Sequence, residues 1–194
     1  MESIVLWDVM GTLVHDPFFV EMPEFFGVTF DALLEVKHPS AWVEFELGKC
    51  SEEDFLQRFF SDGRDFDRRA FVGSVRSSYR WLPGLAELLA ELRGAGCAMH
   101  AFSNYPVWYQ LIDEQLGLSR FLDWTFVSCL TGFRKPDPAA YAHVLSELGV
   151  SAERCVFVDD RLHNCEAARQ CGIRSVVFEG IGPLRESLHD AGVM

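Results

Sequence analysis

The sequence predicts an α/β fold, in which a doubly wound parallel sheet forms a Rossmann-like core and carries a small all-helical cap domain. Short runs rich in β-branched and aromatic residues recur along the chain, and helical patterns that stop at glycine lie between them. Such alternation of strands and helices is typical of a parallel sheet covered by helices on both faces. One long segment near the N-terminus has helical spacing but no strand, and this segment predicts the cap.

The expected strands are short and apolar enough to be buried on both faces. They are Ile4 to Trp7, Ala98 to Phe102, Thr125 to Ser128, Cys155 to Val158 and Ser175 to Phe178. The helices between them are expected to close at glycine, which adopts the left-handed backbone conformation found at helix C-termini. They are Leu85 to Arg93, Val107 to Leu116, Ala139 to Leu148 and Cys165 to Gln170.

The strandless segment runs from about Asp16 to Arg80 and is rich in phenylalanine. We therefore predict two domains: a core of residues 1–15 and 81–194, and a helical cap of residues 16–80 inserted after the first strand. Both parts are acidic, so this division rests on the pattern of helices and strands alone.

The composition indicates a globular protein with a sizeable core, because 49% of the 194 residues are hydrophobic and 24% are charged. The net charge of −12 argues against binding to nucleic acid or to an anionic membrane surface. No apolar run has the roughly 18 residues that a membrane span needs, and no export signal opens the chain. We expect a cytoplasmic protein with reduced cysteines, although a chloroplast stromal protein without its transit peptide would look the same. The pattern indicates no particular oligomeric state.

Polar residues follow the expected strands, at the edge of the sheet where open α/β folds bind ligands. In chain order they are Asp8, Gly11 and Thr12, then Ser103 and Asn104, then Lys135, and finally Asp159 and Asp160. Each of these residues, taken alone, fits an ordinary turn or helix cap. Because all of them follow strands at the same edge of the sheet, they together favour a ligand-binding or catalytic site. Carboxylates suit Mg²⁺, which also binds water and substrate phosphate, and Lys135 would neutralise phosphoryl oxygens.

These motifs resemble the haloacid dehalogenase superfamily. The strings IVLWDVMGTL, HAFSN, RKPDP and CVFVDD match its nucleophile, Ser/Thr, Lys and acidic-pair motifs in order, and the insertion resembles the helical cap of its C1 class. The resemblance implies a hydrolase that uses Mg²⁺ and acts on a small phosphorylated metabolite.

The resemblance also implies a role for each catalytic residue. Asp8 would attack phosphorus to form an aspartyl-phosphate, Ser103 would hydrogen-bond a phosphoryl oxygen, and Lys135 would neutralise the charge of nucleophile and phosphate. Thr12 would orient the acid/base residue or its loop.

The implied metal ligands are the carboxylates of Asp8, Asp159 and Asp160, together with the backbone carbonyl of Met10. Met10 is also where the sequence departs from the superfamily, because it replaces the second aspartate of the first motif. That aspartate protonates the leaving group and then activates water, and a thioether does neither.

A closer resemblance bears on this departure. The strings DVM, HDPFF, FSNYPVWY and DDRLHN resemble the plant chloroplast FMN hydrolases of the superfamily, which implies that methionine at this position is a family feature and that FMN is the substrate. Aromatic residues near the motifs can stack on an isoalloxazine ring, and the alternative is that they form the core of the cap. The predicted substrate-binding residues are Thr12, Asn104, Tyr105, Phe18, Trp42 and Phe45.

Two alternatives stay open at this stage. A 2-haloacid dehalogenase also uses an aspartate nucleophile and lacks the second aspartate, but it needs no metal, and the Asp159–Asp160 pair would repel its carboxylate substrate. A phosphometabolite-binding protein that lost catalysis with the change to Met10 would bind phosphate without turnover. A substrate screen with and without Mg²⁺ separates these readings.

Overall fold

The computed structural model describes residues 3–194 and contains a five-stranded, all-parallel sheet with the strand order β3-β2-β1-β4-β5. The strands are β1 (Ile4–Trp7), β2 (Ala98–Ser103), β3 (Asp123–Val127), β4 (Cys155–Asp159) and β5 (Arg174–Val177). Because β1 is central, the residues that follow it lie between those that follow β2 and β4. This order places the predicted catalytic motifs side by side.

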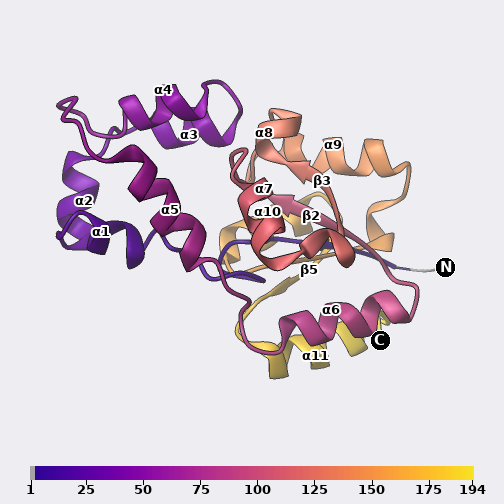
Figure 1. Ribbon diagram of the computed structural model, residues 1–194. Helices are drawn as coiled ribbons and strands as arrows, with labels where there is room; N and C mark the ends of the chain where they lie inside the picture. Colours follow the sequence, from indigo (N-terminus) through magenta and orange to yellow (C-terminus); the bar gives the residue numbers. More distant parts are fainter. Residues whose placement is uncertain (1–2) are drawn as a thin grey trace.

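Helices cover both faces of the sheet, and successive residues of β1 alternate between them. Val5 and Trp7 belong to one buried cluster, and Ile4 and Leu6 belong to another on the opposite face. The core helices are α6 (Leu85–Gly94), α7 (Tyr109–Leu116), α8 (Ser128–Thr131), α9 (Pro138–Leu148), α10 (Leu162–Gln170) and α11 (Ile181–Asp190), with short 3₁₀ helices at Leu118–Arg120 and Ala152–Arg154. Figure 1 shows α6 and α11 together below the sheet, where an Arg185–Glu91 ion pair of 2.7 Å joins them.

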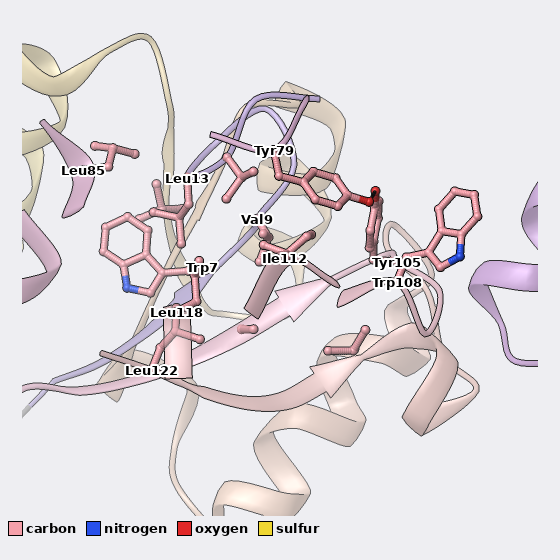
Figure 2. Close-up of a cluster of buried hydrophobic side chains, with 14 of the residues drawn as sticks. Trp7, Val9, Leu13, Tyr79, Leu85, Tyr105, Trp108, Ile112, Leu118 and Leu122 are labelled. Carbon is pink, nitrogen blue, oxygen red and sulfur yellow. Dashed lines mark hydrogen bonds between the residues drawn. The ribbon is translucent and has the colours of Figure 1, made fainter. Parts of the chain in front are cut away.

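The larger cluster continues from the sheet toward the cap. Figure 2 shows Trp7, Leu85 and Leu122 around the sheet end of this cluster, and Tyr79 and Tyr105 at its other end. The hydroxyls of Tyr79 and Tyr105 hydrogen-bond to each other at 2.8 Å. One continuous core therefore extends from α6 to the base of the cap.

The five predicted strands are confirmed, with their ends within about two residues of the expected positions. Ser128 was expected to end the third strand and instead begins α8. The α11 helix had no counterpart in the prediction, although Pro183 in its first turn and the buried Leu184 and Leu188, four residues apart, are signals of an amphipathic helix.

The segment between β1 and α6 is helical, as expected. Its helices are α1 (Glu21–Phe25), α2 (Phe30–Val36), α3 (Ala41–Glu46), α4 (Glu52–Gln57) and α5 (Arg68–Ser78), which lie at one end of the sheet (Figure 1). Side-chain oxygens cap three of them, including Ser51, which forms a capping box with Asp54 at the start of α4. The division of the chain into two domains at residues 15/16 and 80/81 stays a prediction.

Phenylalanine rings fill the interior of these cap helices. Phe71 is fully buried, with ring centroids of Phe25, Phe26, Phe59 and Phe66 between 5.1 and 5.5 Å away. Among the described residues, no helix is long and apolar enough to cross a membrane. None of the six cysteines, which all lie within residues 3–194, forms a disulfide.

Candidate active site

A buried lysine lies at the centre of the predicted site. Lys135 Nζ donates to Asp8 Oδ1 at 2.8 Å and to Asp159 Oδ2 at 2.6 Å, and the lysine is only 1% exposed. The rings of Phe102 and Phe157 lie 5.2 and 4.9 Å from Nζ. A buried ammonium is stable when it is paired in this way, so the two carboxylates and the two rings fix Lys135 in one position.

Asn104 joins the loop after β2 to the loop that carries Lys135. Its side-chain amide donates to the Lys135 carbonyl and accepts from the Lys135 N–H, both at 2.8 Å. This paired contact holds the backbone of Lys135 while the carboxylates hold its side chain. Asn104 is thereby a structural support for the predicted site.

The loop after β1 is tied to the loop after β4 by Thr12. Its hydroxyl donates to Asp8 Oδ2 at 3.1 Å and accepts from the Asp160 N–H at 3.0 Å. Gly11 has φ of +81°, and a Cβ at this residue would lie 2.8 Å from Asp160 Oδ2. Glycine is therefore required here both by the backbone conformation and by the close approach of Asp160.

Three carboxylates converge at this edge of the sheet. Asp8, Asp159 and Asp160 each place one oxygen within 4.8 Å of the others. Asp159 is further held by the Arg161 N–H at 2.8 Å and by the Asn164 amide at 3.0 Å. With the three carboxylates ionised and Lys135 protonated, the cluster carries a formal charge of −2.

The donor set fits a hard divalent cation, because carboxylate oxygens are the ligands that Mg²⁺ prefers. Three buried polar atoms here also have no hydrogen-bond partner within residues 3–194, namely Asp160 Oδ1, Asn164 Oδ1 and the Ser103 hydroxyl. Buried polar groups are rarely left unpaired. The site therefore has unpaired groups suited to a cation and to a phosphoryl oxygen.

Burial and nearby negative charge raise the pKa of Asp8 and of Asp160. The pKa of Asp8 is raised to about 7, chiefly because burial penalises its ionised form, while Lys135 opposes the shift and Asp159 and Asp160 add to it. Burial and then Asp159 raise the pKa of Asp160. A positive charge placed among these carboxylates would reverse both shifts.

A cavity of about 410 Å³ opens between the sheet edge and the cap helices. Asp8, Met10 and Lys135 line its inner end, and aromatic residues such as Phe18 and Trp42 line it on the cap side. Polar contacts between the cap and core lie beside it: Arg134 pairs with Glu46 at 2.7 Å, and the Trp108 indole N–H donates to Glu52. The buried catalytic edge thus faces a cavity that is lined by residues of both the core and the cap helices.

The profile of the haloacid dehalogenase-like hydrolase family matches residues 3–172, which is most of the chain. The chain belongs to this family. It is 46% identical over 190 residues to flavin mononucleotide hydrolase 1 of Arabidopsis thaliana, a chloroplast protein by its name, covering 98% of this chain and 78% of that one. It is also 32% identical to a sesquiterpene phosphatase of Aspergillus oryzae, over 75% of this chain and 76% of that one.

The fold is shared with a haloacid dehalogenase family enzyme of Bacteroides thetaiotaomicron, whose crystal structure contains magnesium and inorganic phosphate. The TM-score is 0.73 with 16% identity, over 95% of this chain and 99% of that one. Family membership and the phosphatase relatives identify the protein as a phosphatase of the haloacid dehalogenase family. Enzymes of this family typically use Mg²⁺.

Most of the residues predicted for the site lie together in this phosphatase. Asp8, Met10, Phe18, Trp42, Asn104, Tyr105 and Lys135 line the cavity, and Thr12, Ser103, Asp159 and Asp160 lie at its catalytic end. Phe45 does not reach the cavity, because it is fully buried and stacks on Phe55 with ring centroids 4.6 Å apart. Its position fits the alternative prediction, in which it belongs to the core of the cap.

The sequence analysis predicted no site role for some residues that line the cavity, although Asp16 and Arg161 lie in the strings HDPFF and DDRLHN. Asp16, Glu46 and Arg161 line the cavity without having been singled out. The signal available for Asp16 was its place in the loop that carries the nucleophile. Glu46 offered no comparable signal, because its position depends on how the cap folds over the core.

Proposed function

We propose that the chain is a Mg²⁺-dependent phosphomonoesterase that works through an aspartyl-phosphate at Asp8 and hydrolyses FMN. The observation that carries this proposal is the arrangement of three carboxylates, within 4.8 Å of one another, around a buried lysine that faces an aromatic-lined cavity. A nucleophile, a charge-neutralising group and a set of metal ligands are thus in reach of one substrate.

Asp8 is suited to act as the nucleophile, because its carboxylate is oriented from both sides. Lys135 donates to Oδ1 and Thr12 donates to Oδ2, so neither oxygen rotates freely. The positive charge of Lys135 favours the ionised carboxylate needed for attack and also neutralises the incoming phosphoryl oxygens. The unpaired hydroxyl of Ser103 is available to donate to one of those oxygens.

Asp8, Asp159, Asp160 and the Met10 carbonyl would hold the Mg²⁺. The bound ion would supply positive charge beside the transferring phosphoryl group. Asn164 and the backbone N–H of Arg161 keep Asp159 in place for this role. Thr12 does the same for Asp160, through its backbone N–H.

FMN is proposed as the substrate on two grounds. The cavity lies within the ordinary range of ligand sites, about 300 to 1,000 Å³, and Phe18, Trp42 and Tyr105 give it an apolar aromatic side for an isoalloxazine ring. The 46% identical Arabidopsis relative is named a flavin mononucleotide hydrolase. That relative's name also supports the chloroplast stroma as an alternative to the cytoplasm.

A substrate screen tests the proposal. FMN, phosphoglycolate and p-nitrophenyl phosphate are incubated with the wild-type protein and with Asp8→Asn, each in Mg²⁺ and in chelator, and phosphate release is measured. The proposal expects release by the wild type in Mg²⁺ alone, with FMN giving the highest kcat/KM. Chloride release from a 2-chloroacid in chelator would instead support a dehalogenase. Tight phosphate binding without any turnover would support a binding protein.

A further inference from the structure

Met10 leaves the inner end of the cavity without an obvious proton donor. The leaving oxygen of an alkyl phosphate needs a proton as its bond to phosphorus breaks, and water must lose one when it attacks the aspartyl-phosphate. Met10 lies beside Asp8 in the cavity lining, and its thioether performs neither task. Another cavity group must exchange these protons if FMN is to be hydrolysed.

The side chains that line the cavity include the carboxyls of Asp8, Asp16 and Glu46. Asp8 is bound to Lys135 and is the proposed nucleophile. Glu46 is bound to Arg134 at 2.7 Å and is 3% exposed. Asp16 differs from both, because within residues 3–194 it forms one hydrogen bond and no ion pair. Its Oδ1 accepts that hydrogen bond from the Phe18 N–H at 3.0 Å.

The local fold keeps Asp16 near Met10. Residues 9–14 turn back on themselves: the Gly11 N–H donates to the Val14 carbonyl at 2.8 Å, and Met10 and Val14 form a β-bridge. Asp16 is two residues beyond Val14, a span of about 7 Å at most. The His15 N–H donates to the Arg80 carbonyl at 2.9 Å, which anchors the chain immediately before Asp16.

The surroundings of Asp16 favour its protonated form. Burial raises its pKa, Asp160 adds to the shift, and the Phe18 N–H, Arg161 and His15 oppose it. Other ionisable side chains also line the cavity, among them Glu46, Arg161 and His163. A carboxyl with a raised pKa in a partly apolar cavity is suited to acid–base catalysis.

We propose that Asp16 is the general acid and base of this phosphatase and performs the proton transfers that the Met10 side chain does not perform. As the Asp8 oxygen forms its bond to phosphorus and the phosphorus–oxygen bond of the ester breaks, the Asp16 carboxyl gives its proton to the leaving alkoxide. The resulting carboxylate then takes a proton from the water whose oxygen bonds to phosphorus as the bond between phosphorus and the Asp8 oxygen breaks. Inorganic phosphate leaves, and both aspartates return to their starting states. This inference rests on the proposed function.

The leaving group provides the test. Asp16→Asn keeps the acceptor for the Phe18 N–H but has no acidic proton, and p-nitrophenolate leaves without being protonated. In rapid-mixing experiments with Mg²⁺, we expect the variant to release a burst of nitrophenolate within about threefold of the wild-type rate. Its later steady-state rate should fall, because the base for dephosphorylation is missing. Cleavage of FMN should slow about 10² to 10⁴-fold from the first turnover.

Two further variants separate catalysis from structure. Asp65→Asn, at an exposed carboxylate in the cap, should match the wild type on both substrates. When Met10→Asp is added to Asp16→Asn, it should raise FMN turnover at least about tenfold. The same change in the wild-type protein, where Asp16 is present, should raise FMN turnover much less. This rescue would not occur if Asp16→Asn had damaged the fold.

Several results would overturn the assignment. The first is an unchanged rate of FMN cleavage in Asp16→Asn. The second is an equal loss of the nitrophenolate burst and of FMN cleavage that Met10→Asp does not restore. The third is slow FMN cleavage with a normal nitrophenolate burst in Glu46→Gln or His163→Gln in place of Asp16→Asn. Nitrophenolate release by the wild-type protein shows whether the assignment of Asp16 or the proposed function has failed. If the wild type releases no nitrophenolate in Mg²⁺, the phosphatase mechanism itself is wrong.

Discussion

The catalytic edge of the sheet and the interior of the cap are both buried, but opposite kinds of interaction hold them together. At the catalytic edge the buried side chains are polar, and directional bonds such as those of Lys135 to Asp8 and Asp159 fix them. In the cap the buried side chains are almost all apolar, and phenylalanine is the commonest residue type among them. Glu46 is the one buried charged residue that the structure describes in residues 16–80, and it faces the catalytic loop through Arg134.

This contrast indicates which substitutions should affect catalysis and which should affect the stability of the fold. In a network of directional hydrogen bonds, the change of one polar atom removes a catalytic or positioning contact. In an aromatic core, the loss of one ring lowers the packing energy. Substitutions at the edge should therefore lower or abolish turnover while the protein stays folded. Substitutions in the cap interior should lower the free energy of unfolding while the catalytic groups stay intact.

The largest effect is expected at Asp8. Asp8→Asn removes the nucleophile and should lower kcat by about 10⁴-fold or more, since loss of a covalent nucleophile is among the most costly changes in an enzyme. Steady-state phosphate release measures the loss, and circular dichroism shows whether the fold is kept. Asp123→Asn, at the exposed start of β3, is the matched control and should keep wild-type turnover. Substantial activity in Asp8→Asn would mean that the nucleophile lies elsewhere.

The next effect is on the stability of the cap. Phe71→Ala should lower the free energy of unfolding by about 3 to 5 kcal/mol, because it empties the centre of the ring cluster. Phe19→Ala is the control, since Phe19 is 48% exposed and should cost far less. Denaturant unfolding followed by tryptophan fluorescence measures both. Equal losses in the two variants would show that the buried rings are not what stabilises the cap.

A smaller effect is expected from the link between the two loops of the site. Thr12→Val leaves Asp8 Oδ2 and the Asp160 N–H without their shared hydroxyl, which should cost about 1 to 3 kcal/mol. We expect this cost to appear as a roughly tenfold or greater loss in kcat/KM, because both partners serve the proposed metal site. Thr12→Ser keeps the hydroxyl and should retain most of the activity. If serine is as damaging as valine, the methyl group and not the hydroxyl is what matters.

The smallest effect concerns an ion pair on the cap surface. Hydrogen bonds from Arg58 and then from Ser40 lower the pKa of Glu44 to about 2. Arg58→Ala should raise this pKa toward its ordinary value, and NMR titration of the Glu44 carboxyl measures the change. Because the folded-state pKa is depressed, the pair stabilises the fold above the ordinary carboxyl pKa and is lost as pH falls toward 2. An unchanged titration would mean that the pair does not form in solution.

The same contrast explains what the sequence could predict. The strands and catalytic edge were predictable because uninterrupted apolar runs mark buried parallel strands, and the residues directly after them meet at one edge. Asp8 and Lys135 therefore came together as expected, although 127 residues separate them.

The cavity wall was harder to predict, because it depends on how the cap packs against the core. The sequence predicted both Trp42 and Phe45 as substrate-binding residues, but helical spacing does not indicate which of them faces the cavity. In the structure Trp42 lines the cavity and Phe45 packs against Phe55. Glu46 was missed for the same reason, since its position beside the cavity depends on contact with the distant Arg134.

The central claim is that a phosphoryl group passes through Asp8 with the help of a bound Mg²⁺. Rapid acid quench of the wild-type protein during FMN turnover, followed by mass spectrometry of its peptides, tests this claim most directly. The account predicts one phosphoryl group on Asp8, formed in Mg²⁺ and absent both in chelator and in Asp8→Asn. A phosphoryl group on another residue, or FMN turnover at the wild-type rate in chelator, would contradict it.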